Sequence, residues 1–229
     1  RKSATLLLVL FISNFHRRFR LRKQVLLTGV AGFIGSNLAK HLIDMGYEVV
    51  GVDNLSSGDI NRIPKKVDFI EVDLADENFV QNMIKVKPAA ILHLAGQSSG
   101  EISFDNPKED LRSNAITTLN LITVAKQLEK CHLIFASSMA VYGDVDVPVS
   151  EEHSLRPKTF YGVSKLASEK YLNVVREHIP VTIFRLSNVY GKNQDFKNLR
   201  QGMVSIYLAQ AIANKNVVVK GSLQRVRDF

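Results

Sequence analysis

The 229-residue sequence predicts an α/β fold, a parallel, doubly wound sheet with helices on both faces. Short apolar stretches of strand length alternate with longer amphipathic stretches of helix length. A glycine-rich turn follows the first of these apolar stretches. Hydrophobic residues make up 45% of the chain, which is ordinary for a globular protein with a sizeable core. Alternating strands and helices favour a parallel sheet, because each crossover between parallel strands returns through a helix.

The first element pair begins at Gln24. Val25–Leu27 is expected to form a short buried strand, Phe33–Met45 a helix with apolar residues at helical spacing, and residues 47–53 a second apolar strand. Gly46 suits the carboxyl end of that helix. The sequence therefore predicts a βαβ unit, the building block of a Rossmann-like sheet.

The first turn of this unit is rich in glycine. Gly29, Gly32 and Gly35 follow the first strand at a spacing of three residues. A side chain at Gly29 or Gly32 would obstruct the approach of a pyrophosphate, and Gly35 lets the helix pack closely on the strand. The helix N-terminus supplies unpaired N–H groups for phosphate oxygens. The turn therefore predicts a dinucleotide site, although its G-x-x-G-x-x-G spacing differs from the standard G-x-G-x-x-G.

Asp53 ends the second predicted strand, 24 residues beyond Gly29. A carboxylate at that position can accept hydrogen bonds from the adenosine ribose hydroxyls. The same negative charge would repel a 2′-phosphate. Asp53 therefore favours NAD over NADP as the cofactor.

The remaining chain continues the alternation of strands and helices. We expect strands over residues 66–74, 89–96, 131–138 and 181–191 (the last with its turn), helices over 78–86, 107–130 and 159–178, and long loops over 54–66 and 143–158. Ligands of such sheets bind at the carboxyl ends of the strands.

Charge is concentrated at the N-terminus. The net charge is +8, but residues 1–23 hold seven Lys and Arg and no acidic residue, so the remainder is nearly neutral. This distribution argues against nucleic acid as a partner, which would need a basic face on the folded domain. The apolar run Ala4–Ile12 is shorter than the about 20 residues of a membrane span. Residues 1–23 are expected to lie outside the fold, with a signal anchor as the alternative.

A single cysteine, Cys131, excludes a disulfide within the chain and favours a reducing compartment such as the cytoplasm. No cluster of His, Cys and carboxylate residues has metal-ligand spacing, so no metal site is predicted. His93 is expected to be a packed strand residue.

Four motifs, "TGVAGFIG", "HLAG", "SSMAVYG" and "YGVSK", occur in that order. With them the chain from Gln24 to Phe229 resembles the extended short-chain dehydrogenases/reductases. More narrowly it resembles their NAD-dependent nucleotide-sugar epimerase/dehydratase group, of which UDP-glucose 4-epimerase is the familiar member. "VDNLSSG", "RLSNVYG" and the terminal "RVRDF" strengthen the narrower resemblance.

The resemblance implies a catalytic group of Ser138, Tyr161 and Lys165. Tyr161 would be the acid/base, Lys165 would hold the nicotinamide ribose from the same helix face, and Ser138 would hydrogen-bond the reacting sugar hydroxyl. A free tyrosine has a pKa of about 10. Positive charge from Lys165 and from oxidised nicotinamide is expected to lower the Tyr161 pKa toward the operating pH.

The resemblance also implies contacts along the rest of the cofactor and to the substrate. The expected cofactor residues are Phe33 and Ile34 at the pyrophosphate; Asp53, Asn54, Ser57 and Gly58 at the adenosine ribose; Asp73 and Leu74 beside the adenine; Leu94, Ala95 and Gly96 along the cofactor; and Asn114 near the nicotinamide. Asn188 and Arg227 match positions that contact the substrate diphosphate.

The implied activity is a UDP-sugar 4-epimerase that oxidises C4 to a keto-sugar and returns the hydride to the other face. The related 4,6-dehydratases carry an Asp-Glu pair directly after the Ser/Thr position, where this chain has Met139 and Ala140. That difference counts against a dehydratase. The alternatives are another nucleotide-sugar dehydrogenase, decarboxylase or dehydratase of the same family, or an NAD-binding module without catalysis, because fold alone does not fix function.

Three segments are expected: a leader over 1–23, an NAD-binding domain with the catalytic residues over 24–190, and the start of a small substrate domain over 191–229. The family usually continues beyond "RDF", so this last domain is expected to be incomplete. The resemblance further implies a homodimer built from the two long helices, residues 107–130 and 159–178.

Overall fold

The computed structural model describes residues 24–76, 78–128, 130–145, 148–195, 202–214, 216–219 and 223–224. The leader, residues 1–23, and the predicted substrate residue Arg227 lie outside these ranges. In the described part of the chain, no helix is long and apolar enough to cross a membrane.

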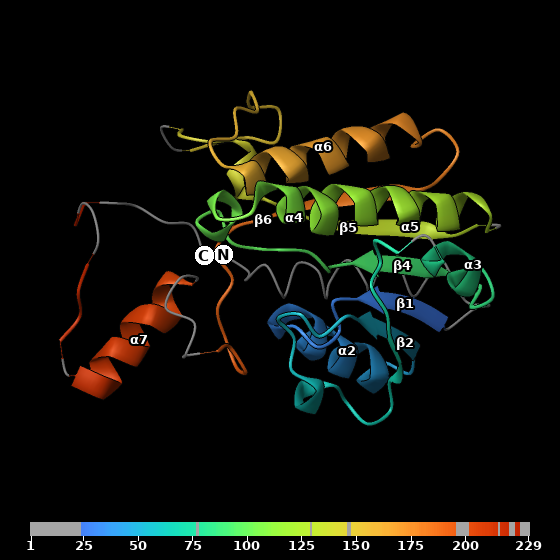
Figure 1. Cartoon of the computed structure of the whole chain (residues 1–229), viewed down its shortest axis with the longest axis horizontal. Helices are drawn as coiled ribbons and strands as arrows, with labels where there is room; N and C mark the ends of the chain where they lie inside the picture. The colour runs from blue at the N-terminus through green and yellow to red at the C-terminus, as the bar shows by residue number, and fades with distance from the viewer. Residues whose placement is uncertain are drawn as a thin grey trace.

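A six-stranded parallel sheet forms the centre of the described structure (Figure 1). Its strands are β1 Gln24–Thr28, β2 Glu48–Asp53, β3 Asp68–Glu71, β4 Ala90–His93, β5 His132–Ser138 and β6 Val181–Leu186. The strand order is β3-β2-β1-β4-β5-β6, which reverses direction between β1 and β4. This is the order of a doubly wound dinucleotide-binding sheet, so the predicted Rossmann-like fold is confirmed.

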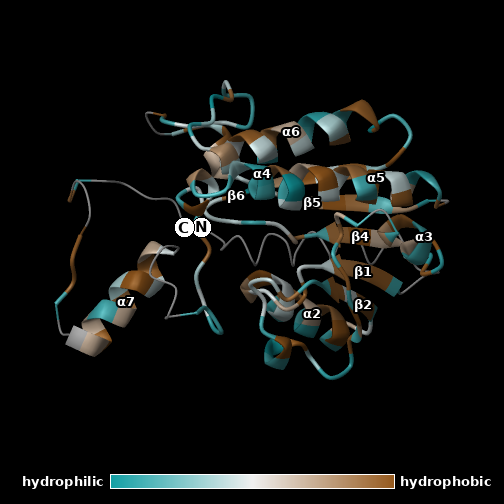
Figure 2. Cartoon of the chain, in the orientation of Figure 1, coloured by the Kyte–Doolittle hydropathy of each residue, from teal (hydrophilic) through white to brown (hydrophobic). Residues whose placement is uncertain are grey.

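Helices cover both faces of the sheet, because its strands are apolar on both sides (Figure 2). One core cluster joins Leu26, Ile91 and Phe135 of the sheet to the helices α3 (Phe79–Met83), α5 (Thr117–Lys126) and α6 (Phe160–Val174). The other joins Leu27 and Leu92 to α2 (Phe33–Asp44). Neighbouring residues along β1 therefore point into opposite cores, as the alternation of strand side chains requires.

The long helix predicted over 107–130 is interrupted. α4 (Pro107–Leu111) runs through a π-helical turn, η3 (Arg112–Ile116), into α5, which ends at Lys126. The prediction was wrong at its carboxyl end, where Lys130 has a left-handed φ of 58°. It also missed the π turn, because nothing in the apolar spacing marks a turn widened by one residue.

Most of the other helices and strands are shorter than predicted by one to a few residues, whereas β1, Gln24–Thr28, is longer than the predicted Val25–Leu27. β4 ends at His93 rather than at residue 96, and α6 ends at Val174 rather than at His178. Leu94 and Ala95 leave the sheet because their N–H groups donate to the Thr28 hydroxyl of β1 rather than to a neighbouring strand. α7 (Met203–Asn214) was not predicted and stands apart from the sheet in Figure 1.

Candidate active site

The glycine turn after β1 is closed by its own backbone contacts. Gly29 has a φ of 71°, and a Cβ there would lie 2.8 Å from the backbone nitrogen of Ala95. A Cβ on Gly35 would lie 2.0 Å from the carbonyl oxygen of Gly29. Both positions therefore require glycine whether or not a ligand binds.

Gly32 is different, because a Cβ there would approach only the Gly29 carbonyl, at 3.2 Å. It is the N-cap residue of α2, and no side chain caps that helix. The N–H groups at the start of α2 are thus available to an anion. This open cradle at the reversal point of the strand order fits the pyrophosphate of a dinucleotide.

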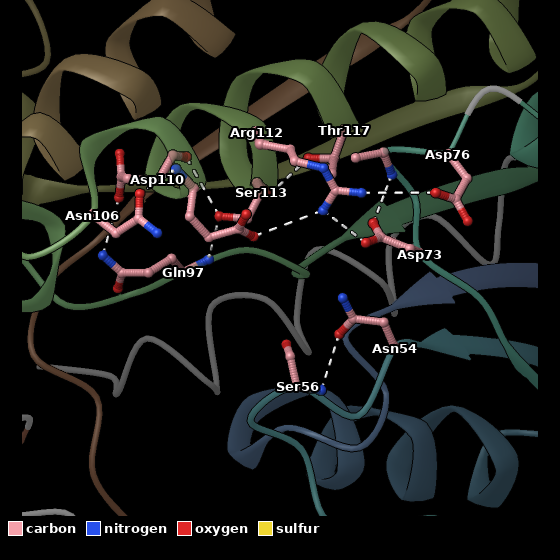
Figure 3. Close-up of polar contacts among 12 residues, drawn as sticks. Asn54, Ser56, Asp73, Asp76, Gln97, Asn106, Asp110, Arg112, Ser113 and Thr117 are labelled. Carbon is pink, nitrogen blue, oxygen red and sulfur yellow. Dashed lines mark hydrogen bonds and ion pairs between the residues drawn. The ribbon is translucent and has the colours of Figure 1, made fainter.

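Asp53 connects this turn to the following loop. Its carboxylate, 8% exposed, accepts hydrogen bonds from the N–H of Ala31 and of Leu55, both at 2.9 Å. Each oxygen keeps a further lone pair that could accept a ribose hydroxyl. In the same loop Asn54 accepts a bond from Ser56 N–H at 3.1 Å (Figure 3), and Gly58 packs against Ala31.

Asp73, predicted beside the adenine, is held by an arginine that the sequence analysis missed. The Arg112 guanidinium donates to the Asp73 carboxylate at 2.7 Å and lies 3.7 Å from Asp76 (Figure 3). Burial alone would raise the pKa of Asp73, but hydrogen bonds from Ala75 N–H and Arg112 outweigh it, so the pKa is lowered. Leu74 is 4% exposed beside it.

A buried histidine joins β1 and β4 to α5. The Thr28 hydroxyl accepts the N–H groups of Leu94 and Ala95, each at 3.1 Å, so its own hydrogen points to His93 Nδ1 at 2.9 Å. His93 therefore carries its proton on Nε2, which lies 3.3 Å from the Thr118 hydroxyl. Burial, with a smaller contribution from Lys165, lowers the His93 pKa to about 3, so the ring is neutral.

Ser138 and Tyr161 meet at the carboxyl end of β5. Ser138 accepts the Ala140 N–H at 3.2 Å as the N-cap of η4 (Met139–Val141), which leaves its hydroxyl hydrogen for another acceptor. Tyr161 lies in the first turn of α6, which Thr159 caps through Gly162 N–H at 3.0 Å. The Ser138 hydroxyl acts on the Tyr161 phenol and lowers its pKa.

Lys165 is 4% exposed, one turn beyond Tyr161. Its Nζ lies 4.8 Å from the ring centroid of Phe135 and 5.8 Å from that of Tyr161. Burial lowers the Lys165 pKa to about 8, although the charge of Asp110 opposes the shift. The three predicted catalytic side chains are thus gathered in one place.

The protein's own groups shift the Tyr161 pKa upward, whereas the predicted lowering also included the charge of oxidised nicotinamide. Burial raises the Tyr161 pKa, the hydrogen bond from Ser138 lowers it, and the charge of Asp110 raises it further. The prediction rested on the positive charges of Lys165 and oxidised nicotinamide and left out the loss of water around the phenolate, which is the largest effect among the protein's own groups.

Asn114 lies fully buried in the π turn η3. Its amide nitrogen donates to the carbonyl oxygens of Gln97 and Asp110, both at 3.1 Å, while its Oδ1 has no partner among the described residues. A Cβ on Gly96 would come within 2.4 Å of that oxygen. The glycine is therefore needed where the loop after β4 passes Asn114.

The remaining predicted residues lie along the same edge. Asn188, after β6, approaches the Met139 sulfur with its Nδ2 at 4.0 Å. The segment after β6 also reaches the start of α2, where Phe33 and Ile34 lie, because Asn37 Nδ2 donates to the Lys192 carbonyl at 3.1 Å. The described residues contain no group of three or more His, Cys, Asp or Glu that could hold a metal ion.

These features define a class of protein: a doubly wound α/β chain with a dinucleotide cradle and a half-buried tyrosine beside a buried lysine at one edge of the sheet. The model of the NAD dependent epimerase/dehydratase family matches residues 25–229, and the chain belongs to this family. The resemblance stated from the motifs and the predicted cofactor, NAD, are confirmed by this assignment.

Named relatives span more than one reaction. The UDP-glucose 4-epimerase of Mycolicibacterium smegmatis is 33% identical over 90% of this chain and 68% of its own length. UDP-glucuronic acid decarboxylase 1 of Xenopus tropicalis is 32% identical over 91% of this chain and 50% of its own length. The crystal structure of the Thermotoga maritima UDP-glucose 4-epimerase with UDP-glucose has a TM-score of 0.85 at 34% identity, covering 90% of this chain and 68% of that chain.

Proposed function

We propose that this chain is a UDP-sugar 4-epimerase, with Ser138, Tyr161 and Lys165 as its catalytic residues. The observation that carries the proposal is the grouping of the half-buried Tyr161 with Ser138, whose hydroxyl lowers the Tyr161 pKa, and with the buried Lys165, whose Nζ lies 5.8 Å from the Tyr161 ring centroid. A tyrosine acid/base with a second hydroxyl beside it can take and return the proton of one alcohol group.

Tyr161 takes the proton of the sugar C4 hydroxyl and gives it back when the C4 epimer forms. NAD, held by the cofactor residues named in the next paragraph, would supply the acceptor and donor of the C4 hydride. Ser138 hydrogen-bonds the C4 oxygen and keeps it aligned with the phenol. Lys165 binds the nicotinamide ribose and, while protonated, favours the phenolate form of Tyr161.

The proposed cofactor site follows the carboxyl edge from β3 to β5. Its residues are Gly29, Gly32, Phe33, Ile34, Gly35, Asp53, Asn54, Ser57, Gly58, Asp73, Leu74, Leu94, Ala95, Gly96, Asn114, Tyr161 and Lys165. Asn188 and Arg227 are proposed for the substrate diphosphate. The NAD-binding domain is proposed to span 24–190, and the part that binds substrate is proposed to begin at 191.

A UDP-glucuronate decarboxylase is the second candidate, because the Xenopus tropicalis decarboxylase matches this chain almost as closely as the epimerases do. Oxidation at C4 would be shared, so the same catalytic residues would serve. A dehydratase has less support, since Met139 and Ala140 offer no carboxylic acid next to Ser138 for the elimination of water.

A turnover assay separates these reactions. UDP-glucose, UDP-N-acetylglucosamine and UDP-glucuronate are each supplied with NAD, and the products are resolved by chromatography. We expect the C4 epimer, lost on Tyr161→Phe and kept on Tyr171→Phe, a matched change on the same helix at a side chain 40% exposed. Release of CO₂ from UDP-glucuronate alone would favour the decarboxylase. No product from any sugar, with NAD still bound, would favour a binding module.

A homodimer and a cytoplasmic location complete the proposal. Apolar side chains stand exposed on α5 and α6: Leu119 by 36%, Val163 by 52% and Val174 by 78%. Such exposure on two neighbouring helices is typical of a surface that a second copy covers.

Cys131 is buried, and burial raises the pKa of its thiol to about 12, so it stays unreactive.

A further inference from the structure

A buried carboxylate that the proposed mechanism does not use lies next to the catalytic helix. Asp110, on α4, is 1% exposed. Its Oδ1 accepts the Gln97 amide at 3.0 Å (Figure 3) and the Asn114 amide at 3.3 Å. Its Oδ2 accepts the Ser164 hydroxyl at 2.6 Å. One side chain thus joins α6, the loop after β4 and the π turn η3.

All three hydrogen-bond donors to Asp110 are neutral. Burial raises the pKa of the Asp110 carboxyl, and the charge of Lys165 opposes that shift and favours the carboxylate. The charged groups before it, Glu101 and Asp105, and its neighbour Glu109 are exposed to solvent. Arg112 is directed to Asp73. On α6 the Asp110 charge acts on Lys165 and Tyr161, whereas the buried Glu169 of the same helix pairs with Arg185 at 2.8 Å.

We propose that Asp110 is a positioning residue, which fixes α6 against the loop after β4 and holds the buried Lys165 as a cation. The inference rests on the proposed function, since a charged Lys165 matters only if Tyr161 acts as the acid/base. Removing water from an ammonium group favours its neutral form, and a nearby carboxylate reverses that preference.

The pKa shifts agree in sign with this role. Burial lowers the Lys165 pKa to about 8, and the Asp110 charge raises it against that effect. The same charge raises the Tyr161 pKa, in addition to burial. Without the charge of Asp110, both groups should titrate at lower pH.

Asp110→Asn removes the charge while retaining the hydrogen bonds. The amide oxygen can accept from Gln97 and Asn114 in place of Oδ1. The amide nitrogen can donate to the Ser164 oxygen, because the Ser164 hydroxyl has a second acceptor, the Tyr161 carbonyl at 3.0 Å. Glu109→Gln is the matched control, since it removes one charge at the neighbouring position, where the side chain is 50% exposed.

The first test titrates Tyr161 in the free protein, by the difference in tyrosinate absorbance between each variant and the same variant with Tyr161→Phe. Lys165 has already lost its proton at the pH where Tyr161 titrates, so the Asp110 charge acts on the phenol directly. We expect the Tyr161 midpoint to fall by about one pH unit in Asp110→Asn. It should stay in place in Glu109→Gln.

The second test is the pH profile of kcat/KM for epimerisation. Its alkaline limb, where Lys165 loses its proton, should move about one pH unit lower in Asp110→Asn and stay in place in Glu109→Gln. A purely structural role would lower the melting temperature and move neither the profile nor the phenol titration. An unmoved phenol titration in Asp110→Asn would overturn the inference. A moved titration in a protein without epimerase activity would support it and count against the proposed function instead.

Discussion

At the scale of single residues, His93 links the loop after β4 to α5 as a neutral ring. Its pKa of about 3 lies below that of a free histidine, so the unfolded chain binds a proton more readily than the folded chain. Folding stability that this ring contributes is present above the unfolded pKa of about 6.5 and is lost as pH falls toward the folded pKa.

We therefore predict that His93→Gln changes the acid stability of the protein. A glutamine can still accept from Thr28 and donate to Thr118, but it takes up no proton. Below pH 6.5 the free energy of unfolding of the native chain should fall more steeply than that of the variant, by up to about 1.4 kcal/mol per pH unit. Urea denaturation between pH 7 and pH 4 measures this difference. Parallel pH dependence in the two proteins would show that His93 is not a buried neutral group.

At the scale of elements, the close packing of α2 on the glycine turn requires that Gly35 has no side chain. Since a Cβ there would lie 2.0 Å from a backbone oxygen, Gly35→Ala must push the helix away from the glycine turn. We predict a loss of about 1–3 kcal/mol in the free energy of unfolding and weaker NAD binding by calorimetry. Lys40→Ala on the same helix, at a side chain 70% exposed, should change both by little. Equal effects of the two variants would contradict the close packing.

Elements that depend on local sequence were predicted well. The glycine turn, the apolar strands and the helix containing Tyr161 each carry their signal within a dozen residues. The π turn at Asn114 was not predictable from local sequence. The Asn114 amide donates to the carbonyl of Asp110 within the turn and also to the carbonyl of Gln97, which lies in a different loop. Arg112 was missed for the same reason, since its partner Asp73 comes from a different strand end. Contacts between segments far apart in sequence leave no periodic pattern to read.

At the scale of the whole molecule, the exposed apolar residues of α5 and α6 predict a dimer. Light scattering at micromolar concentration should give twice the chain mass. Val174→Glu should reduce that value to the monomer mass, because a buried unpaired carboxylate is costly. Leu208→Glu, a matched change on α7 at a side chain 48% exposed, should leave the dimer intact. A monomeric native chain would contradict the proposed interface.

The most direct test of the proposed chemistry uses UDP-glucose with deuterium at C4. If the hydride leaves C4 and returns to the same carbon, the C4 epimer formed in ordinary water keeps its deuterium, and Tyr161→Phe forms none of this product. Mass spectrometry of the separated epimer reads the label. An epimer that has exchanged its C4 deuterium for solvent hydrogen would contradict transient oxidation at C4 as the mechanism.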